Sequence, residues 1–200
     1  MSYYKEQLKN WLNEKVFTSD RVLSIGCMNN DLDYFADYSV NELVTIDISD
    51  EYKPNVKADM NLPFWIQLSG VEKEIVKNGF NDIFAFELAE YLWNPIMFLD
   101  TCNELLIDGG KLWLSSPFIY PTHNPFDKDY LRYTEYFWKR ALEETGFEIT
   151  EYRRRIWKEP QYFMKAIASD GMRPAKKYNH NVTGHLIIAK KTGKPKRKWS

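Results

Sequence analysis

The chain has 200 residues, of which 44% are hydrophobic and 28% are charged, and its formal net charge at pH 7 is −1. These are the values of a globular protein with one domain, so they exclude wholesale disorder, and the near-zero charge gives no support for a nucleic-acid partner. The two cysteines, Cys27 and Cys102, lack the spacing of metal ligands or of a disulfide framework. We therefore expect no metal and a reducing, cytoplasmic environment.

The first expected element is a helix over residues 3–15. Apolar side chains recur there at helical spacing, at Tyr4, Leu8, Trp11 and Leu12. The segment is amphipathic and charged, unlike a signal peptide, and no apolar run in the chain approaches the ~18 residues of a membrane span. The expectation is a cytoplasmic protein that does not enter a membrane.

A strand over residues 21–25 leads into Gly26, and a second strand over 43–46 ends on Asp47. Strand, glycine turn, short helix, strand and acid is the layout of a nucleotide-binding βαβ unit. Asp47 follows Gly26 by 21 residues (26 to 47), close to the ~20 expected for an acid that binds ribose hydroxyls. The alternative role for this acid is to cap its own turn.

Between these two strands, a short helix is expected from Asn30 or Asp31 to about Tyr38. The later elements are a strand over 55–58, a weak helix over 71–77, a strand over 80–86, a helix over 95–106, a strand over 111–115, a helix over 134–144 and strands over 147–156 and 185–189.

Local signals define the ends of two of these helices. Asn94 is expected to cap the helix over 95–106, with Pro95 at its first position and Gly109-Gly110 ending it, and Thr134 is expected to cap the later one. Strands that alternate with helices indicate an α/β fold, namely a doubly wound, mostly parallel sheet with helices on both faces. We predict one domain over residues 1–190 and a flexible basic tail over 191–200.

Five stretches, in order along the chain, carry a family resemblance. They are V-L-S-I-G-C at 22–27, V-T-I-D at 44–47, K-A-D-M-N-L-P-F at 57–64, F-N-D-I-F-A-F-E-L-A-E-Y-L-W-N-P at 80–95 and L-L-I-D-G-G-K-L-W-L-S-S-P-F at 105–118. They resemble the motifs of the class I S-adenosylmethionine (SAM)-dependent methyltransferases, most closely the small general methyltransferase domains. The resemblance implies a seven-stranded, Rossmann-like sheet with its last strand antiparallel, SAM as cofactor and a transferase activity.

The resemblance also assigns cofactor contacts. In the family, the turn at Gly26 lies under the methionine part of SAM, the acid at Asp47 grips the ribose, and the acid at Asp59 meets the adenine amino group. A turn or helix-cap role competes for Asp59. The full cofactor-binding set is Ser24, Gly26, Cys27, Met28, Asp47, Ile48, Asp59, Met60, Phe86 and Glu87.

Three departures from the family pattern keep a second hypothesis open. Ser24 stands where the family has aspartate, Met28 where it has glycine, and Tyr91 where it has histidine. A glycine at the second of these positions lets the backbone pass close to the cofactor. The alternative is a methyltransferase-like domain without catalysis that serves as a binding or scaffold protein. The hypothesis that the chain is a nicotinamide dehydrogenase is weaker still, because the G-x-G-x-x-G motif is missing.

The loop over 116–133 is expected to cover the methyl acceptor, because long loops in compact domains are usually functional. From His123 onward the chain resembles an H-x-x-x-D-Y-x-R-Y-T segment that covers the acceptor in a subset of the family. We assign catalytic roles to His123, Asp127 and Tyr130, with the histidine as a base or orienting group or, alternatively, bonded to backbone. The implied reaction methylates an oxygen or nitrogen of a small-molecule or sugar/glycan-type acceptor.

Charged side chains elsewhere are given structural interpretations. Arg132 is expected to pair with Asp129 rather than with an acidic acceptor. The run Arg153 to Arg155 and the basic tail are interpreted as solvated surface, although on one face they would favour a phosphate-bearing substrate. The sequence leaves the oligomeric state open.

Overall fold

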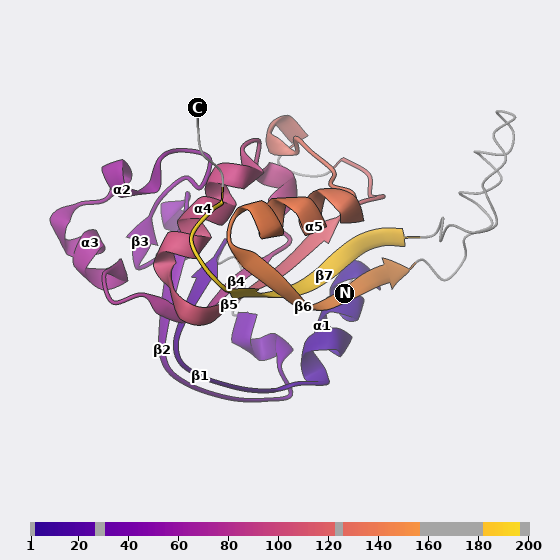
Figure 1. Cartoon of the computed structure of the whole chain (residues 1–200), viewed down its shortest axis with the longest axis horizontal. Helices are drawn as coiled ribbons and strands as arrows, with labels where there is room; N and C mark the ends of the chain where they lie inside the picture. Colours follow the sequence, from indigo (N-terminus) through magenta and orange to yellow (C-terminus); the bar gives the residue numbers. More distant parts are fainter. Residues whose placement is uncertain (1–2, 27–30, 123–125, 157–181, 197–200) are drawn as a thin grey trace, which may run out of the picture.

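The computed structural model describes residues 3–26, 31–122, 126–156 and 182–196. Within these residues, seven strands form one sheet in the order β3-β2-β1-β4-β5-β7-β6 (Figure 1). The strands are β1 (Val16–Ile25), β2 (Asp37–Asp47), β3 (Val56–Lys57), β4 (Phe80–Phe86), β5 (Leu106–Pro117), β6 (Phe147–Ile156) and β7 (Val182–Lys191).

The strand directions confirm the predicted fold class. β2 and β4 run parallel to β1, and β3 and β5 extend the parallel part on either side. β7 is antiparallel to both of its neighbours, β5 and β6. The strand order reverses between β1 and β4, and in such sheets ligands bind beyond the carboxyl ends of the strands at this switch point.

One face of the sheet is covered by α1 (Tyr3–Asn13) and the 3₁₀ helix η1 (Asp31–Tyr34) (Figure 1). Trp11 of α1 packs there in one apolar cluster with Phe84 of β4, and Phe35, which follows η1, stacks on the same Phe84 ring at 5.6 Å between centroids. Burying these rings holds both elements on the sheet, because apolar burial is the main driving force of packing.

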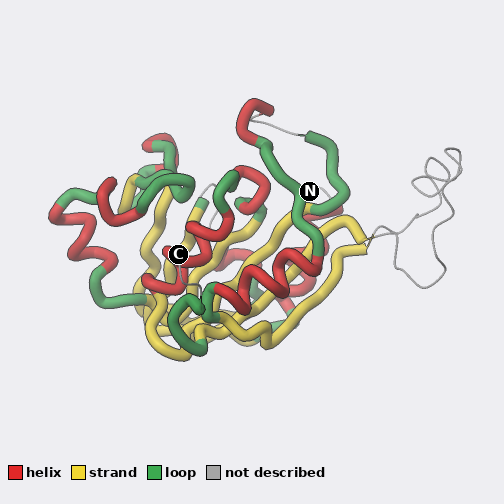
Figure 2. The backbone as a smooth tube through the Cα atoms, turned by 45° about the horizontal axis from the view of Figure 1, so that its top comes forward, coloured by secondary structure: helices red, strands yellow, loops and turns green. Residues whose placement is uncertain are grey.

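The opposite face carries α3 (Gly70–Val76), α4 (Pro95–Leu105) and α5 (Glu135–Glu144). Their apolar side chains, including Phe98 and Trp138, form a second core with the strands. Helices therefore lie on both faces, as predicted, and Figure 2 shows helices in front of and behind the strands. The connections contain α2 (Phe64–Gln67), η2 (Asp50–Tyr52), η3 (Ala89–Tyr91) and η4 (Phe126–Lys128).

Side-chain caps start the helices where the sequence predicts. The Asn94 side chain accepts a hydrogen bond from the Met97 N–H at the start of α4, and Thr134 does the same for the Phe137 N–H of α5. These bonds satisfy backbone donors that have no partner within the helix. Both predicted caps are confirmed.

The predicted helix up to Tyr38 is wrong. Only the single 3₁₀ turn of η1 forms, and the chain is extended again from Asp37, whose Cα pairs with that of Val16 on β1. The first half of β2 is mostly exposed and polar. It therefore lacks the alternation of apolar and polar side chains by which strands are recognised in a sequence.

The prediction that Gly109-Gly110 ends a helix is also wrong. α4 ends at Leu105, and both glycines lie inside β5. A Cβ added at Gly110 would lie 3.0 Å from the carbonyl oxygens of Asn81 and Ile107. Glycine is required at this position because two backbones approach each other there, next to an irregularity in the pairing of β4 with β5.

The beginning of the predicted tail is held against the turn between α5 and β6. The Thr192 N–H donates to the Gly146 carbonyl oxygen at 2.9 Å, and the Lys196 N–H donates to that of Glu144 at 2.9 Å. Residues 197–200 lie outside the described residues.

Candidate functional site

The carboxyl ends of β1, β2 and β3 lie side by side at one edge of the sheet. Gly26 follows β1 with φ +81°, and its N–H donates to the Ile46 carbonyl oxygen of β2 at 2.9 Å. The next residue of β2, Asp47, accepts from the Ala58 N–H through its backbone oxygen at 3.0 Å. Two of the predicted site residues, one glycine turn and one acid, are therefore on adjacent strand ends.

Asp47 is buried at the end of β2. Its Oδ1 accepts a hydrogen bond from the Ser49 N–H at 2.8 Å, so the turn-capping role is present. Ile48 beside it is 53% exposed.

Asp59 and Met60 follow β3 in a segment that is tied to the chain after β4. Asp59 Oδ1 accepts from the Asn61 N–H at 2.8 Å, while Met60 is buried. The Asn61 side chain donates to the Tyr91 carbonyl oxygen at 3.0 Å and accepts from the Trp93 N–H at 2.9 Å. The expected adenine residues are therefore linked by hydrogen bonds to the segment that follows β4.

The end of β4 holds Phe86 and Glu87 in different settings. Phe86 is buried and stacks on Phe84 at 5.3 Å between centroids. Glu87 has φ +52°, a conformation that non-glycine residues rarely adopt. Its N–H donates to Ser115 Oγ at 2.9 Å, and its Oε1 accepts from that hydroxyl and from Arg155 Nη2, both at 2.6 Å. These bonds fix the direction of the Glu87 carboxylate at the strand end.

Arg155 corrects one interpretation of the sequence. The side chains of Arg153 and Arg154 are partly exposed and pair with Glu14 and Glu135, as expected of solvated surface. The Arg155 side chain is fully buried and pairs with Glu87 at the end of β4, although strand alternation places it on the same face of β6 as the partly exposed Arg153.

The sequence predicts Asp31 only as a possible helix cap, but the structure places it beside Ser24. Both residues are buried, and Ser24 Oγ donates to Asp31 Oδ2 at 2.5 Å. Burial raises the pKa of Asp31 to about 7, and the Ser24 hydrogen bond acts in the opposite direction. The only signal in the sequence was an acid seven residues after a serine that stands in an acid's place.

The predicted acceptor loop is anchored at the end of β4. The Tyr130 N–H donates to the Glu90 carbonyl oxygen at 2.8 Å. Arg132 pairs with Asp129, which confirms the structural interpretation of that arginine. Asp127 lies exposed in η4, and His123, Cys27 and Met28 lie outside the described residues. Among the predicted catalytic residues, the contacts therefore bring Tyr130 to the edge that carries Glu87.

Glu90 adds a buried carboxyl group beneath this loop. Burial and then the charge of Glu87 raise the pKa of Glu90 to about 8, so it is largely protonated at neutral pH. Burial likewise raises the pKa of Tyr91 to about 12. The acceptor side of the edge therefore holds fewer negative charges than its carboxyl groups suggest.

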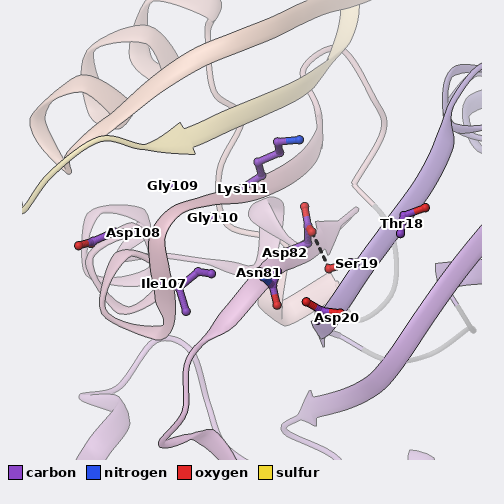
Figure 3. A pocket seen from close by; sticks show the side chains of 10 residues that line it. All are labelled: Thr18, Ser19, Asp20, Asn81, Asp82, Ile107, Asp108, Gly109, Gly110 and Lys111. Atoms are coloured by element: carbon purple, nitrogen blue, oxygen red, sulfur yellow. Dashed lines mark hydrogen bonds between the residues drawn. The ribbon is translucent and has the colours of Figure 1, made fainter.

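A hollow of about 300 Å³ lies at the opposite edge, along the amino-terminal halves of β1, β4 and β5 (Figure 3). Asp82 lines it and accepts hydrogen bonds from Ser19 Oγ and Trp113 Nε1, both at 2.7 Å. This carboxylate already has protein partners, and the hollow is remote from Gly26 and Asp47. We therefore place the candidate site at the carboxyl edge.

Comparison with known proteins identifies the fold. No family model and no curated protein matches the chain, but many solved structures do. A SAM-dependent methyltransferase from Archaeoglobus fulgidus matches with a TM-score of 0.58 and 17% identity, covering 94% of this chain and 92% of that one. An S-adenosylmethionine-dependent methyltransferase from Mesorhizobium loti matches with 0.54 and 15%, covering 92% and 96%. The chain has the class I methyltransferase fold.

The class I methyltransferase fold also hosts other chemistry. The [4+2]-cyclase SpnF matches with a TM-score of 0.57 and 16% identity, covering 94% of this chain and 80% of that one. Function must therefore be argued from the site rather than from the fold.

The described part of the chain lacks two further features. None of its helices is long and apolar enough to cross a membrane. It also contains no group of three or more His, Cys, Asp or Glu side chains that is arranged to hold a metal ion.

Proposed function

We propose that the protein is a SAM-dependent methyltransferase that methylates an oxygen or nitrogen of a small-molecule or sugar/glycan-type acceptor. One observation carries the proposal. The glycine turn at Gly26 and the buried acid at Asp47 lie on adjacent strand ends, beside the switch point of the sheet. Nucleotide-containing ligands bind at this position in doubly wound folds.

The residues present fit such a cofactor. Among the described residues, a Cβ added at Gly26 would meet one atom within 4 Å, Leu88 Cδ1 at 3.4 Å, so none of them fills the space directly above this glycine. Asp47 would bind the ribose hydroxyls beside Ile48, while Asp59 and Met60 would hold the adenine. Ser24, Cys27, Met28, Phe86 and Glu87 would complete the set around the methionine part.

The bound cofactor would supply a methyl group activated by its sulfonium, and the protein's task would be to hold the acceptor in line with it. Tyr130 and Glu87, which lie at the same strand end, would shape the acceptor position. An oxygen acceptor benefits from a general base. We assign this role to His123, with Asp127 as its companion in the same loop.

Calorimetry with SAM and S-adenosylhomocysteine tests the cofactor assignment. The wild-type protein should bind both, and Asp47→Asn should weaken binding by about 10- to 100-fold, because hydrogen bonds to a charged group contribute about 1.5–3 kcal/mol. Asp50→Asn is the matched control, since this exposed carboxylate pairs with Lys57 at the surface. No binding of either ligand at millimolar concentration would refute the proposal.

A second candidate function is a methyltransferase-like binding or scaffold protein without catalysis. The observation in its favour is Ser24, which stands in place of an acid. Replacing Met28 by glycine separates the two candidates. If that change creates SAM affinity where the wild type has none, the natural protein is the non-catalytic version.

A further inference from the structure

Asp31 is a buried acid for which the fold offers little compensation. The residue is 7% exposed, and the Ser24 hydroxyl is the one hydrogen-bond partner of its side chain among the described residues. Leu32, the next residue, is buried in the apolar cluster beneath α1. Burying a carboxylate costs free energy unless a charge or several donors compensate for it.

Nearby charges do not supply this compensation. Burial is the dominant cause that raises the pKa of Asp31, and within the described chain only the Ser24 hydroxyl opposes it. Tyr34, on the same 3₁₀ turn, has its own pKa raised by burial and by the charges of Asp31, Glu87 and Asp33. Apart from Arg155, which already pairs with Glu87, the charged groups named around this carboxyl are negative, which favours a cation as the missing partner.

The position of Asp31 indicates which cation. Ser24 is two residues before the Gly26 turn, at the place where the resembling family carries an acid. The methionine part of SAM, which would lie over this turn, carries one ammonium and one carboxylate. The sulfonium that this part shares with the adenosine is also positive, but only the ammonium has N–H donors for a buried acid, and a carboxylate has acceptor sites left after one bond to a hydroxyl.

We propose that Asp31 replaces the acid missing at position 24, and that the Ser24–Asp31 pair binds the ammonium group of the donor's methionine part. This inference rests on the proposed function. It assigns a ligand contact to a residue outside the family's motifs, and it explains how the chain tolerates serine at position 24. Asp31 would enter from η1 rather than from β1, with the Ser24 hydroxyl holding its orientation.

Two ligands separate this role from a merely structural one. S-adenosylhomocysteine carries the ammonium, whereas 5′-methylthioadenosine has the same adenosine without the amino-acid part. By calorimetry, Asp31→Asn should weaken binding of S-adenosylhomocysteine about 10- to 100-fold and leave that of 5′-methylthioadenosine within about threefold. Asp33→Asn, an exposed acid on the same turn, is the matched control and should leave both affinities unchanged.

A rescue variant makes the test independent of local damage. Exchanging the two residues (Ser24→Asp with Asp31→Ser) returns the acid to β1 and should restore S-adenosylhomocysteine affinity to within about threefold of the wild type. Asp31→Asn should fold normally in a thermal melt, because it removes a buried charge.

The possible failures are distinguishable. An equal loss for both ligands, or no loss for S-adenosylhomocysteine, would overturn the role of Asp31 and leave the proposed function intact. If the wild-type protein binds neither ligand, the proposed function itself falls, and the inference falls with it.

Discussion

At the scale of single residues, the Glu87–Arg155 pair is expected to contribute substantially to stability. Arg155 is fully buried and its Nη2 lies 2.6 Å from Glu87 Oε1. Removing one partner of a buried pair leaves an uncompensated charge. Arg155→Met should therefore lower the free energy of unfolding by about 3 kcal/mol in a urea titration.

The matched control for this pair is Arg153→Met. Arg153 lies on the same strand, but its side chain is 43% exposed and pairs with Glu14 at the surface. Such pairs contribute at most about 1 kcal/mol. Equal losses for the two variants would contradict the structural role of the buried pair.

The buried ring of His185 should make the stability of the protein depend on pH. Its Nε2 lies 2.9 Å from the Tyr133 carbonyl oxygen, so Nε2 carries the hydrogen and Nδ1 accepts from the Tyr152 hydroxyl at 2.5 Å. The ring is therefore neutral, and burial lowers its pKa to about 4. A group whose pKa is lower in the folded state gives stability that is complete above its unfolded pKa of ~6.5 and is lost as the pH falls toward 4.

This loss should amount to about 2 kcal/mol between pH 7 and pH 4.5, in addition to the contributions of other groups. His185→Gln removes the titrating ring, so its stability should fall less steeply over this range. Urea titrations of both proteins at several pH values give the two slopes. Parallel curves would show that His185 does not remain neutral in the folded protein.

At the scale of secondary-structure elements, α4 depends on its cap. The Asn94 side chain accepts from the Met97 N–H at 3.2 Å, and Asn94→Ala should lower the free energy of unfolding by about 1 kcal/mol. Asn78→Ala, in the exposed turn before β4, is the control and should change it by less than about 0.5 kcal/mol. If the two variants are equally stable, the cap contributes nothing to α4.

The elements differ in how far the sequence predicts them. β4 was predicted with its observed bounds, Phe80–Phe86, because a strand buried on both faces is apolar nearly throughout. β6 was also predicted with its observed bounds. β2 was predicted only from Leu43 onward, since its first half is exposed and polar. Gly109-Gly110 wrongly predicts a helix end, because a close approach of two strands requires glycine just as a helix end does.

At the scale of the whole molecule, the strand-end residues of the site could be predicted because the βαβ layout places Gly26 and Asp47 at one edge. The contacts that complete the edge depend on the tertiary fold. Arg155 reaches Glu87 from a strand 68 residues away in the sequence, and Tyr130 meets the Glu90 backbone 40 residues away (90 to 130). No local pattern predicts such pairs, because packing alone brings them together.

The most direct test of the account is a crystal structure grown with S-adenosylhomocysteine. We predict the ribose hydroxyls within hydrogen-bonding distance of Asp47 and the adenine against Asp59 and Met60. The amino-acid part should lie over the turn at Gly26, with its ammonium toward Asp31. A structure in which the Met28 side chain fills this space and the ligand is absent from the carboxyl edge would contradict the account, while leaving the fold intact.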